Sequence, residues 1–316
     1  MTSSLRRRHR LFRNRFVIGN RAPARPLEVV VLAVLERPEK AHQPDGALKA
    51  ALIGIAMGGR GTDVAREASA IVLLDDDFGS IVKAIRLGRR IYDNLRKAMS
   101  FIFAVHVPIA GLALLPLVFG LPLLFGPIHI ALLEMVIDPV CSLVFEAETE
   151  EDDVMRRPPR SPDEPLFSRA LVAWSLLQGL LTFAVIAAVY LAGLRWGMPV
   201  PEVRALTFFS LIVVIVSLIL VNRSYSASLL TALRRPNRTL VAVLAAVAVI
   251  LALTLLWPFA NELFAFGPLH ADDLALTLGI GGIALLVLEM LKPLLRPRLQ
   301  PARPLAMDQT SKPTGH

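Results

Sequence analysis

Three ionisable side chains lie in apolar stretches that are long enough to cross a membrane. His106 lies in the run that ends near Phe119, and Glu134 and Asp138 lie one helical turn apart in the next run, directly before Pro139. An ionisable group at membrane depth costs about 2–3 kcal/mol or more unless it is paired or hydrated. We therefore interpret these three residues as a predicted cation site. The alternative is a carboxylate pair that only hydrogen-bonds to a neighbouring helix.

The two runs predict one helical hairpin over residues 97–145, with a very short turn at residues 120–122. A membrane-spanning helix needs about 20 apolar residues, and both arms meet that length. Each arm also holds a proline, which cannot donate the helical hydrogen bond to the carbonyl four residues earlier. The carbonyls of Ala104 and Met135, freed in this way, are predicted as further oxygen ligands.

The composition is that of a polytopic membrane protein. Of the 316 residues, 54% are hydrophobic, and the mean hydropathy of +0.57 is too high for a soluble domain of this size. The single cysteine, Cys141, lies within a predicted span, so no intrachain disulfide can form. Four more apolar runs give six predicted spans in all, and these four lie near residues 169–193, 203–222, 239–260 and 273–291.

The net charge of +8 is distributed unevenly along the chain. Residues 1–26 carry eight arginines and no acidic residue, which we interpret as a disordered basic tail or a miscalled start. Nucleic acid is not an expected partner. The loops on one side of the predicted spans hold most of the other basic residues, among them Arg156, Arg157, Arg160, Arg223, Arg234, Arg235, Arg238 and Lys292. The positive-inside rule places this side, and both termini, in the cytosol.

A small α/β segment precedes the spans. Residues 52–57 and 71–74 are predicted strands, residues 58–61 a glycine-rich loop, and Thr62 the N-cap of a short helix. The apolar run within residues 27–40 favours a further buried strand. Because a parallel sheet needs both faces covered, this segment is too small to be an independent domain. It is interpreted as the last piece of a larger one, joined to the first span by a charged stalk helix.

Five motifs occur in order along the chain: Ile-Gly-Ile-Ala-Met-Gly at 53–58, Gly-Thr-Asp-Val-Ala at 61–65, Leu-Leu-Asp-Asp-Asp-Phe at 73–78, Gly-Arg-Arg-Ile-Tyr-Asp-Asn at 88–94 and Asp-Val-Met-Arg-Arg-Pro-Pro-Arg at 153–160. Together they resemble the end of the phosphorylation domain, the fifth-helix stalk and the loop between the sixth and seventh helices of P-type cation-transporting ATPases. The bacterial calcium-pump-like branch is the nearest fit.

The resemblance implies a mainly α, polytopic membrane protein whose six transmembrane helices follow a small α/β remnant of a HAD-like phosphorylation domain. It divides the chain into a poorly matching basic segment (1–46), the phosphorylation-domain remnant (47–88), a stalk with the six-helix domain (89–295) and a cytosolic tail (296–316). The family's Thr-Gly-Asp-Gly-Val-Asn-Asp hinge motif should end just before Ala47, where unrelated residues stand. The chain is therefore expected to be truncated before that motif.

Members of this family couple ATP hydrolysis to cation movement through an Asp-Lys-Thr-Gly-Thr motif. No Asp of this chain is followed by Lys-Thr, and no Thr-Gly-Glu motif is present. Mg and ATP belong to the intact family, and this chain alone is expected to bind neither, which leaves open whether it is an enzyme. The expected function is the transport portion of such a pump in the inner (plasma) membrane. The alternatives are a non-catalytic protein that binds or regulates an intact pump, and passive conduction of cations or protons.

Aligned through the stalk, His106 falls where calcium pumps carry a site Asn, and Glu134 and Asp138 fall on site positions of the next helix. Three other site positions are apolar in this chain: Ile109, Ile137 and Val216. The resemblance thus implies at most one site, for Ca²⁺ or another divalent cation, although a histidine also admits a transition metal or a proton. His129 is interpreted as a packing or interfacial residue. The expected partners are the lipid bilayer and either the missing N-terminal half or an intact pump.

Overall fold

The computed structural model describes residues 29–31, 53–157, 165–224 and 237–299. The chain forms two compact units, Met1–Gly88 and Arg89–His316. Several sequence predictions lie outside the described residues: the basic segment apart from 29–31, the position of the hinge motif, the loop motif from 158 to 160, and the tail from 300 to 316.

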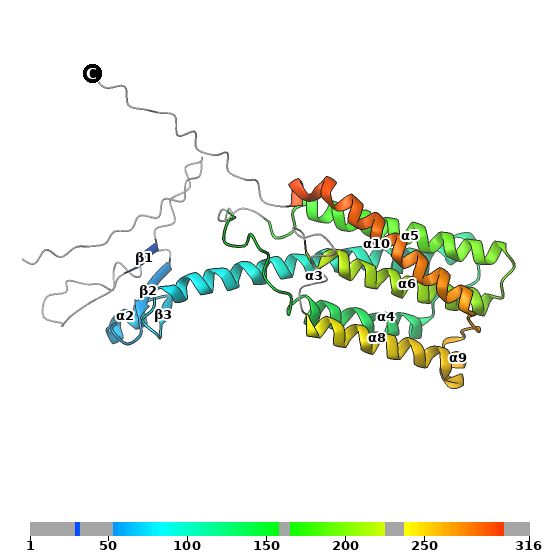
Figure 1. Cartoon of the computed structure of the whole chain (residues 1–316), viewed down its shortest axis with the longest axis horizontal. Helices are drawn as coiled ribbons and strands as arrows, with labels where there is room; N and C mark the ends of the chain where they lie inside the picture. Colours follow the sequence, from blue (N-terminus) through cyan, green and yellow to red (C-terminus); the bar gives the residue numbers. More distant parts are fainter. Residues whose placement is uncertain (1–28, 32–52, 158–164, 225–236, 300–316) are drawn as a thin grey trace, which may run out of the picture. The chain divides into compact units, whose positions relative to one another are not determined.

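The first unit contains a parallel sheet with the strand order β1-β2-β3 (Figure 1). Strand β2 pairs with β3 in the register Ile55 to Ile71. Both predicted strands are found, and β1 falls within the apolar run at 27–40. Ile55, Met57 and Leu73 form a buried cluster on β2 and β3. The strands are β1 (Val29–Val31), β2 (Ile53–Met57) and β3 (Ile71–Leu73).

A short helix, α2 (Asp63–Ala68), follows the glycine-rich loop. Its predicted N-cap is confirmed, because the Thr62 hydroxyl accepts a hydrogen bond from the backbone nitrogen of Ala65 at 3.2 Å. Gly58 is required by a close approach of the chain to β3. A Cβ at this position would lie only 2.8 Å from the carbonyl oxygen of Leu73.

Asp76 connects the segment after β3 to the glycine-rich loop. Its carboxylate accepts hydrogen bonds from the backbone nitrogens of Gly59 and Arg60, both at 2.9 Å. The bond from Gly59, helped by the contacts with Arg60, lowers the pKa of Asp76 below its ordinary value of 3.8. Asp76 has a φ of 53°, a left-handed conformation that aspartate tolerates better than most residues.

The described residues contain six helices that are long and apolar enough to cross a membrane, as predicted. The chain is therefore a mainly α, multi-pass membrane protein. The spans are α3 (Gly79–Phe119), α4 (Pro127–Pro139) continued by the π-helix η1 (Val140–Val144), α5 (Arg169–Arg195), α6 (Val200–Asn222), α8 (Arg238–Leu256) and α10 (Ala271–Leu299). Helix α3 begins in the first unit, and the predicted stalk is the part of α3 before the apolar run.

The connection between α3 and α4 is longer than the predicted three-residue turn. Residues 120–126 are not helical, although most of them are apolar. Their carbonyls are bound instead by side chains from other spans. The Tyr190 hydroxyl donates to the carbonyl of Pro122, and the Arg204 guanidinium donates to those of Leu123 and Leu124 at 3.0 and 3.1 Å. These bonds replace the helical ones that the segment would otherwise make.

The fifth predicted span, near 239–260, is also interrupted. Helix α8 ends at Leu256, and a separate short helix, α9 (Pro258–Phe264), follows it. Pro258 has no N–H to continue the hydrogen bonds of α8. Helix α8 therefore ends before Trp257, and Pro258 is the first residue of α9. The side chains of Trp257 and Phe259 are mostly exposed and lie against each other, as aromatic residues do at membrane interfaces.

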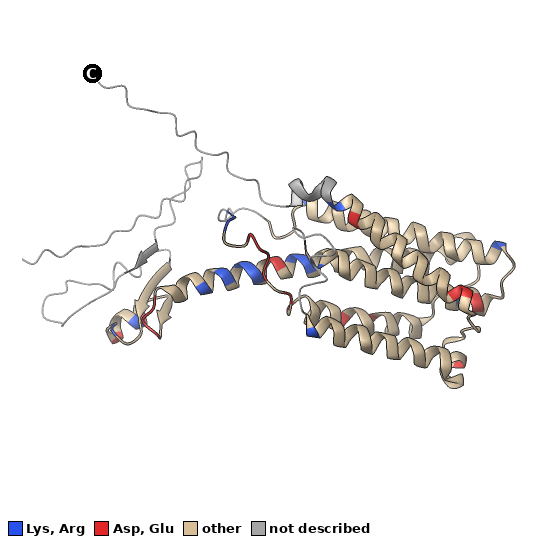
Figure 2. Cartoon of the chain, viewed as in Figure 1, with Lys and Arg blue, Asp and Glu red and all other residues tan. Residues whose placement is uncertain are grey.

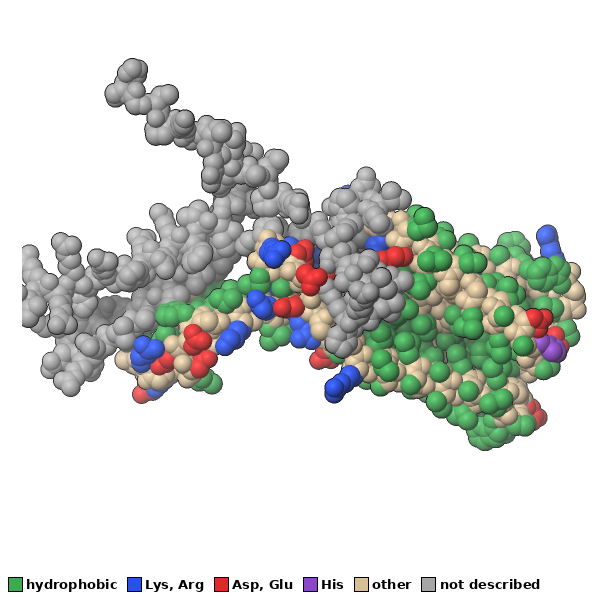
Figure 3. All heavy atoms as spheres, in the orientation of Figure 1, with side chains coloured by type: hydrophobic (Ala, Val, Ile, Leu, Met, Phe, Trp, Pro, Cys, Tyr) green, Lys and Arg blue, Asp and Glu red, His purple; other side chains and the backbone are tan. Residues whose placement is uncertain are grey.

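Helix α6 forms the centre of the second unit and packs against α5 and α10 (Figure 1). Of its most apolar stretch, 83% is buried, compared with 22% for α8 and 17% for α10. Buried polar pairs join neighbouring helices. Asn222 donates to Gln178 at 2.7 Å, and the hydroxyls of Ser100 and Ser175 lie 2.9 Å apart. Figure 3 shows apolar side chains over the visible face of this unit, as expected for a surface in lipid.

Candidate functional site

The structure brings two of the three predicted cation ligands close together. Nε2 of His106, on α3, lies 3.9 Å from Oε1 of Glu134, on α4. Their side chains are 52% and 39% exposed, so the pair lies at the surface of the unit and not in its core. Both residues belong to membrane-spanning stretches. The pair is thus an ionisable couple at membrane depth on an open surface of this chain.

The imidazole of His106 is oriented by its own helix. Nδ1 lies 2.8 Å from the carbonyl oxygen of Ile102, one turn earlier. Because a carbonyl oxygen can only accept, Nδ1 carries the hydrogen and donates it. In the neutral ring, Nε2 then has a free lone pair. This nitrogen is the one that faces Glu134.

Asp138 lies one turn after Glu134 on the same helix face and is exposed. Its backbone carbonyl accepts a hydrogen bond from the Ser142 hydroxyl at 2.7 Å. The three predicted ligands follow one another along one surface, but they do not form a compact three-ligand cluster. Among the described residues, the only such cluster with ligand atoms within 4.8 Å of one another comprises His270, Asp272 and Asp273. That His106, Glu134 and Asp138 act as one site stays a prediction.

The two predicted carbonyl ligands differ in their surroundings. Ala104 is fully buried, and its carbonyl oxygen lies where a Cβ on Gly179 of α5 would come within 2.7 Å. This carbonyl therefore lies close to α5, and its role as a ligand stays a prediction. Met135 lies on the exposed side of α4, and Pro139 offers it no N–H. The π-helix Val140–Val144 follows directly, and π-helical turns are frequent at functional sites.

His129 does not join the predicted site. Its Nδ1 accepts a hydrogen bond from the backbone nitrogen of Gly126 at 3.1 Å, and its Nε2 donates to the carbonyl of Phe264 at 2.9 Å. The ring is buried among aromatic side chains, in contact with Phe125, Phe208, Phe264 and Phe266. The interpretation of His129 as a packing residue is confirmed: it joins the start of α4 to the end of α9.

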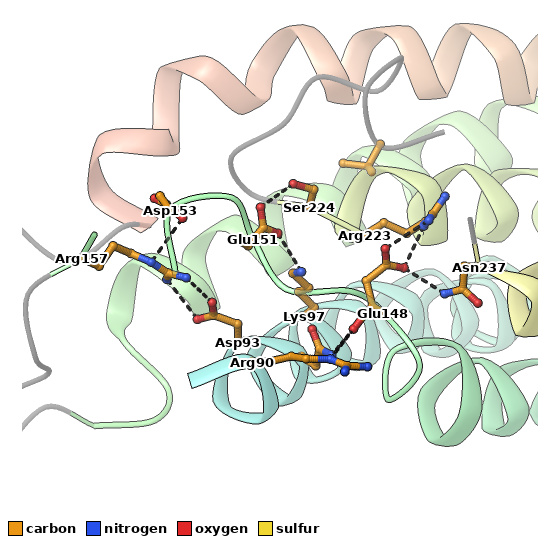
Figure 4. Close-up of polar contacts among 12 residues, drawn as sticks. Arg90, Asp93, Lys97, Glu148, Glu151, Asp153, Arg157, Arg223, Ser224 and Asn237 are labelled. Carbon is orange, nitrogen blue, oxygen red and sulfur yellow. Dashed lines mark hydrogen bonds and ion pairs between the residues drawn. The ribbon is translucent and has the colours of Figure 1, made fainter. Parts of the chain in front are cut away.

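A second group of charged residues, which we call the inner-end network, was not predicted as functional. Figure 4 shows its centre, where Glu148 lies between Arg223 and Asn237. The Arg223 guanidinium donates to both Glu148 carboxylate oxygens, at 2.9 and 3.1 Å, and Asn237 donates to one of them at 3.0 Å. The side chains of Glu148 and Arg223 are only 2% exposed. The ion pair joins the loop after η1 to the end of α6, and the hydrogen bond from Asn237 joins the same loop to the start of α8.

The same loop is bound to α3 by a second buried ion pair of the inner-end network. Lys97 Nζ lies 2.7 Å from Glu151, and the two side chains are 0% and 4% exposed. The Ser224 hydroxyl donates to the other Glu151 carboxylate oxygen at 2.8 Å (Figure 4). The backbone carbonyl of Glu148 accepts bonds from Arg90 and Asn94 of α3 at 2.9 and 2.8 Å. Helix α3, the end of α6 and the start of α8 therefore each contribute polar contacts to this loop.

The loop motif ends in a third ion pair. The Arg157 guanidinium donates two hydrogen bonds to the carboxylate of Asp93 and lies 3.3 Å from Asp153. Burial acts to lower the pKa of Arg157, but the bonds to Asp93 and the nearby carboxylates outweigh burial and raise it. Arg89 donates to the carbonyls of Val154 and Arg157, each at 2.8 Å. The described part of this motif thus fixes the loop on α3.

No signal in the sequence separates the buried acids of this loop from the exposed ones. Residues 146–153 contain six carboxylates in a row broken by Ala147 and Thr149, which resembles a solvated acidic loop. Glu148 and Glu151 are buried because Arg223 and Lys97 reach them from distant parts of the chain. That proximity is a property of the tertiary fold and not of the local pattern.

Comparison with known proteins agrees with this arrangement. Residues 122–294 match the family "Cation transporting ATPase, C-terminus". A calcium-transporting ATPase of Bacillus subtilis (strain 168) is 40% identical over 148 residues, which are 46% of this chain and 17% of that protein. Calcium-transporting ATPase 1 of Lactococcus lactis is 32% identical over 249 residues, covering 78% and 28%. The sodium/potassium-transporting ATPase subunit alpha of Hydra vulgaris is 37% identical over 164 residues, covering 47% and 16%.

The chain therefore spans less than a third of the length of each of these relatives. The family match takes in α4 and every described helix after it, which is the part that carries Glu134, Asp138 and most of the inner-end network. The chain belongs to the P-type cation-transporting ATPase family and corresponds to its C-terminal membrane part, of the calcium-pump-like type.

Proposed function

We propose that this chain is the transport portion of an ATP-driven cation pump, and that His106, Glu134 and Asp138 bind the cation. The observation that carries this proposal is the open His106–Glu134 pair at membrane depth. Ionisable groups in membrane spans usually face a partner or a water-filled pathway. Here the partner of this pair is a cation together with a further membrane segment.

The surface of α3 supports a covering helix. Ile91 and Leu95 are 58% and 46% exposed, and they lie on the same face as Ile102 and His106 at helical spacing. Exposed apolar residues before a span would meet water if nothing covered them. We propose that a helix from the N-terminal part of the pump packs along this stripe and closes the cation site. A relative such as the Lactococcus calcium-transporting ATPase has length enough outside the match to supply one.

We also propose that the chain lies in the inner membrane with both termini in the cytosol. Figure 2 shows Lys and Arg along the part of α3 before its span and acidic residues at the start of α10. The described basic residues of the loops include Arg156, Arg157 and Arg223 on the side assigned to the cytosol. Asp272 and Asp273 begin α10 on the opposite side. This distribution follows the positive-inside rule.

Cation binding to the purified full chain in lipid nanodiscs tests the proposed site. We expect bound divalent cation after equilibrium dialysis, measured by elemental analysis. Glu134→Gln and Asp138→Asn should each lower the affinity at least about tenfold, because losing a ligand should cost no less than losing an outer-shell partner. The matched control is Glu262→Gln, an exposed carboxylate on α9. Binding that is unchanged in both site variants would contradict the proposal.

The chain alone is proposed not to hydrolyse ATP, since no Asp in it stands before Lys-Thr to form the acyl-phosphate. Phosphate release from MgATP by the same nanodisc preparation should equal the protein-free blank. A rate above that blank that scales with protein concentration would overturn this part of the proposal.

A further inference from the structure

We infer that the cation held by His106 and Glu134 is a transition metal of the Zn²⁺ class, and not Ca²⁺. This inference rests on the proposed function, because it names the substrate class of the same site. It stands on one structural feature that the ligand types alone do not reveal, which is the orientation of the His106 ring.

Nε2 of His106 is available to a metal. The hydrogen on the other nitrogen, Nδ1, is committed to the carbonyl of Ile102 at 2.8 Å. The distance of 3.9 Å from Nε2 to Glu134 is beyond hydrogen-bond range, so this lone pair is not used by the carboxylate. The imidazole nitrogen and the carboxylate oxygen therefore lie near each other, and they are not hydrogen-bonded to each other.

The contact with Ile102 is the one that a metal-binding histidine needs. Such a histidine almost always donates its second ring N–H to a carbonyl, a carboxylate or water, which fixes the ring and makes the metal-facing nitrogen more basic. His106 makes this contact within its own helix, four residues back, so it does not depend on another part of the pump. The hydrogen bond to Ile102 therefore fixes the ring orientation that metal binding needs, without any contact from outside this chain.

Ligand chemistry then separates the possible cargoes. Ca²⁺ takes six to eight oxygen ligands, and an imidazole nitrogen in its shell would replace one of them with a poorer donor. Imidazole suits Zn²⁺ and its neighbours, which also accept carboxylate oxygen. A His–Glu pair therefore suits a metal of low coordination number, such as Zn²⁺, better than it suits Ca²⁺. A proton shared between the two side chains is the remaining occupant, and the experiment below separates it.

The exposed cluster of His270, Asp272 and Asp273 must be removed from the measurement. Its ligand atoms lie within 4.8 Å of one another, so it could bind added metal at the surface. The test therefore uses a parent protein that carries His270→Asn and Asp273→Asn. His270 directly precedes α10, and Asp273 lies in its first turn.

The experiment measures Zn²⁺ and Ca²⁺ binding to the full-length parent in nanodiscs, with His106→Asn and Glu134→Gln made in it. Asn matches the size of His near the backbone but offers an oxygen. We expect the parent to prefer Zn²⁺, His106→Asn to lower the Zn²⁺ affinity at least about tenfold without weakening Ca²⁺ binding, and Glu134→Gln to weaken both. As a check without substitution at the site, the ¹⁵N resonance of His106 Nε2, assigned by its loss in His106→Asn, should shift on addition of Zn²⁺ and not of Ca²⁺.

Each other outcome overturns a defined statement. If Glu134→Gln weakens Ca²⁺ binding and His106→Asn leaves the Zn²⁺ affinity unchanged, the metal inference is wrong and the proposed function stands. If neither ion depends on Glu134 or His106, the proposed function fails with it. If Zn²⁺ does not bind and Nε2 gains a proton between pH 8 and pH 5 in a Glu134-dependent way, the pair carries protons and the metal inference is wrong.

Discussion

The inner-end network and the His106–Glu134 pair contain the same kinds of groups in opposite conditions. Glu148 is 2% exposed and receives two hydrogen bonds from Arg223 and one from Asn237. Glu134 is 39% exposed, and the imidazole of His106 lies 3.9 Å from it without a hydrogen bond. One carboxylate has its partners within the chain. The other lies on an open face within a membrane span, where an uncompensated charge is expensive.

This contrast separates groups that hold the fold from groups that we propose to bind a cation. A buried ion pair contributes little net stability by itself, but removing one member leaves the other charged and without compensation. An exposed pair at membrane depth has no such dependent partner, and its cost is tolerated where it serves binding. The network should therefore be sensitive in stability, and the pair in cation binding.

The largest expected effect follows from replacing Glu148. Glu148→Gln should lower the free energy of unfolding by about 3–5 kcal/mol, because Arg223 is left as a buried charge without its carboxylate. Chemical unfolding of the purified chain in detergent measures this. Glu134→Gln is the matched control and should cause no loss of stability, because no buried charge depends on Glu134. Equal losses in the two variants would mean that the buried Glu148 and the exposed Glu134 contribute to stability in the same way.

A double substitution sharpens the same point. Glu148→Met combined with Arg223→Met removes both charges and should recover most of the stability lost in Glu148→Gln. If the double variant is as unstable as the single one, the loop is held by geometry specific to the charged pair and not by the need to neutralise Arg223.

A smaller loss is expected at Lys97. Lys97→Met keeps the apolar stem but removes the ammonium that lies 2.7 Å from Glu151. Glu151 retains the hydrogen bond from Ser224, so we expect a loss of about 1–3 kcal/mol in the same unfolding assay. Lys83→Met, at an exposed position earlier on α3, should be nearly neutral. A loss of stability at Lys83 as large as that at Lys97 would mean that burial does not determine the size of the loss.

The spans were predictable from the sequence because length and apolarity alone define them. Two boundaries were not. Residues 120–126 are as apolar as a helix, and what keeps them non-helical is the binding of their carbonyls by Arg204 and Tyr190, which lie far along the chain. The break at Pro258 had a local signal, since proline ends a helical ladder, but the apolar run on both sides obscured it.

The candidate residues of the site follow from the sequence, and their binding of a cation stays a prediction; the geometry that the structure gives them did not follow from the sequence. That His106 and Glu134 would face each other depends on how α3 packs against α4. The close approach of the Ala104 carbonyl to α5 is possible because residue 179 is a glycine, and the sequence pattern does not relate these two residues. The tautomer of His106 is a local property, because Ile102 lies on the preceding turn, but it needs the side-chain rotamer to be known. The geometry of the candidate site is thus set by tertiary packing and not by local helix propensity.

The smallest expected effect lies in the first unit, where Asp76 is paired but only partly buried, with 16% of its side chain exposed. Its pKa is lowered in the folded chain, so the folded form holds a proton less tightly than the unfolded form. The stabilisation by its carboxylate is therefore complete above about pH 4 and is lost as the pH falls through the lower, folded pKa. Amide hydrogen exchange at Gly59 and Arg60, corrected for intrinsic rates, should show protection that disappears over that range.

Asp76→Asn should lower this protection at neutral pH and remove its pH dependence, because an amide accepts these hydrogen bonds more weakly than a carboxylate. Glu67→Gln, at an exposed position on α2, is the control and should leave the profile unchanged. Asp76 has partners within the chain, as Glu148 does, yet water competes for them. A global unfolding effect at Asp76 as large as that at Glu148 would mean that partnering alone sets the energy, whereas an effect confined to the loop assigns the difference to burial.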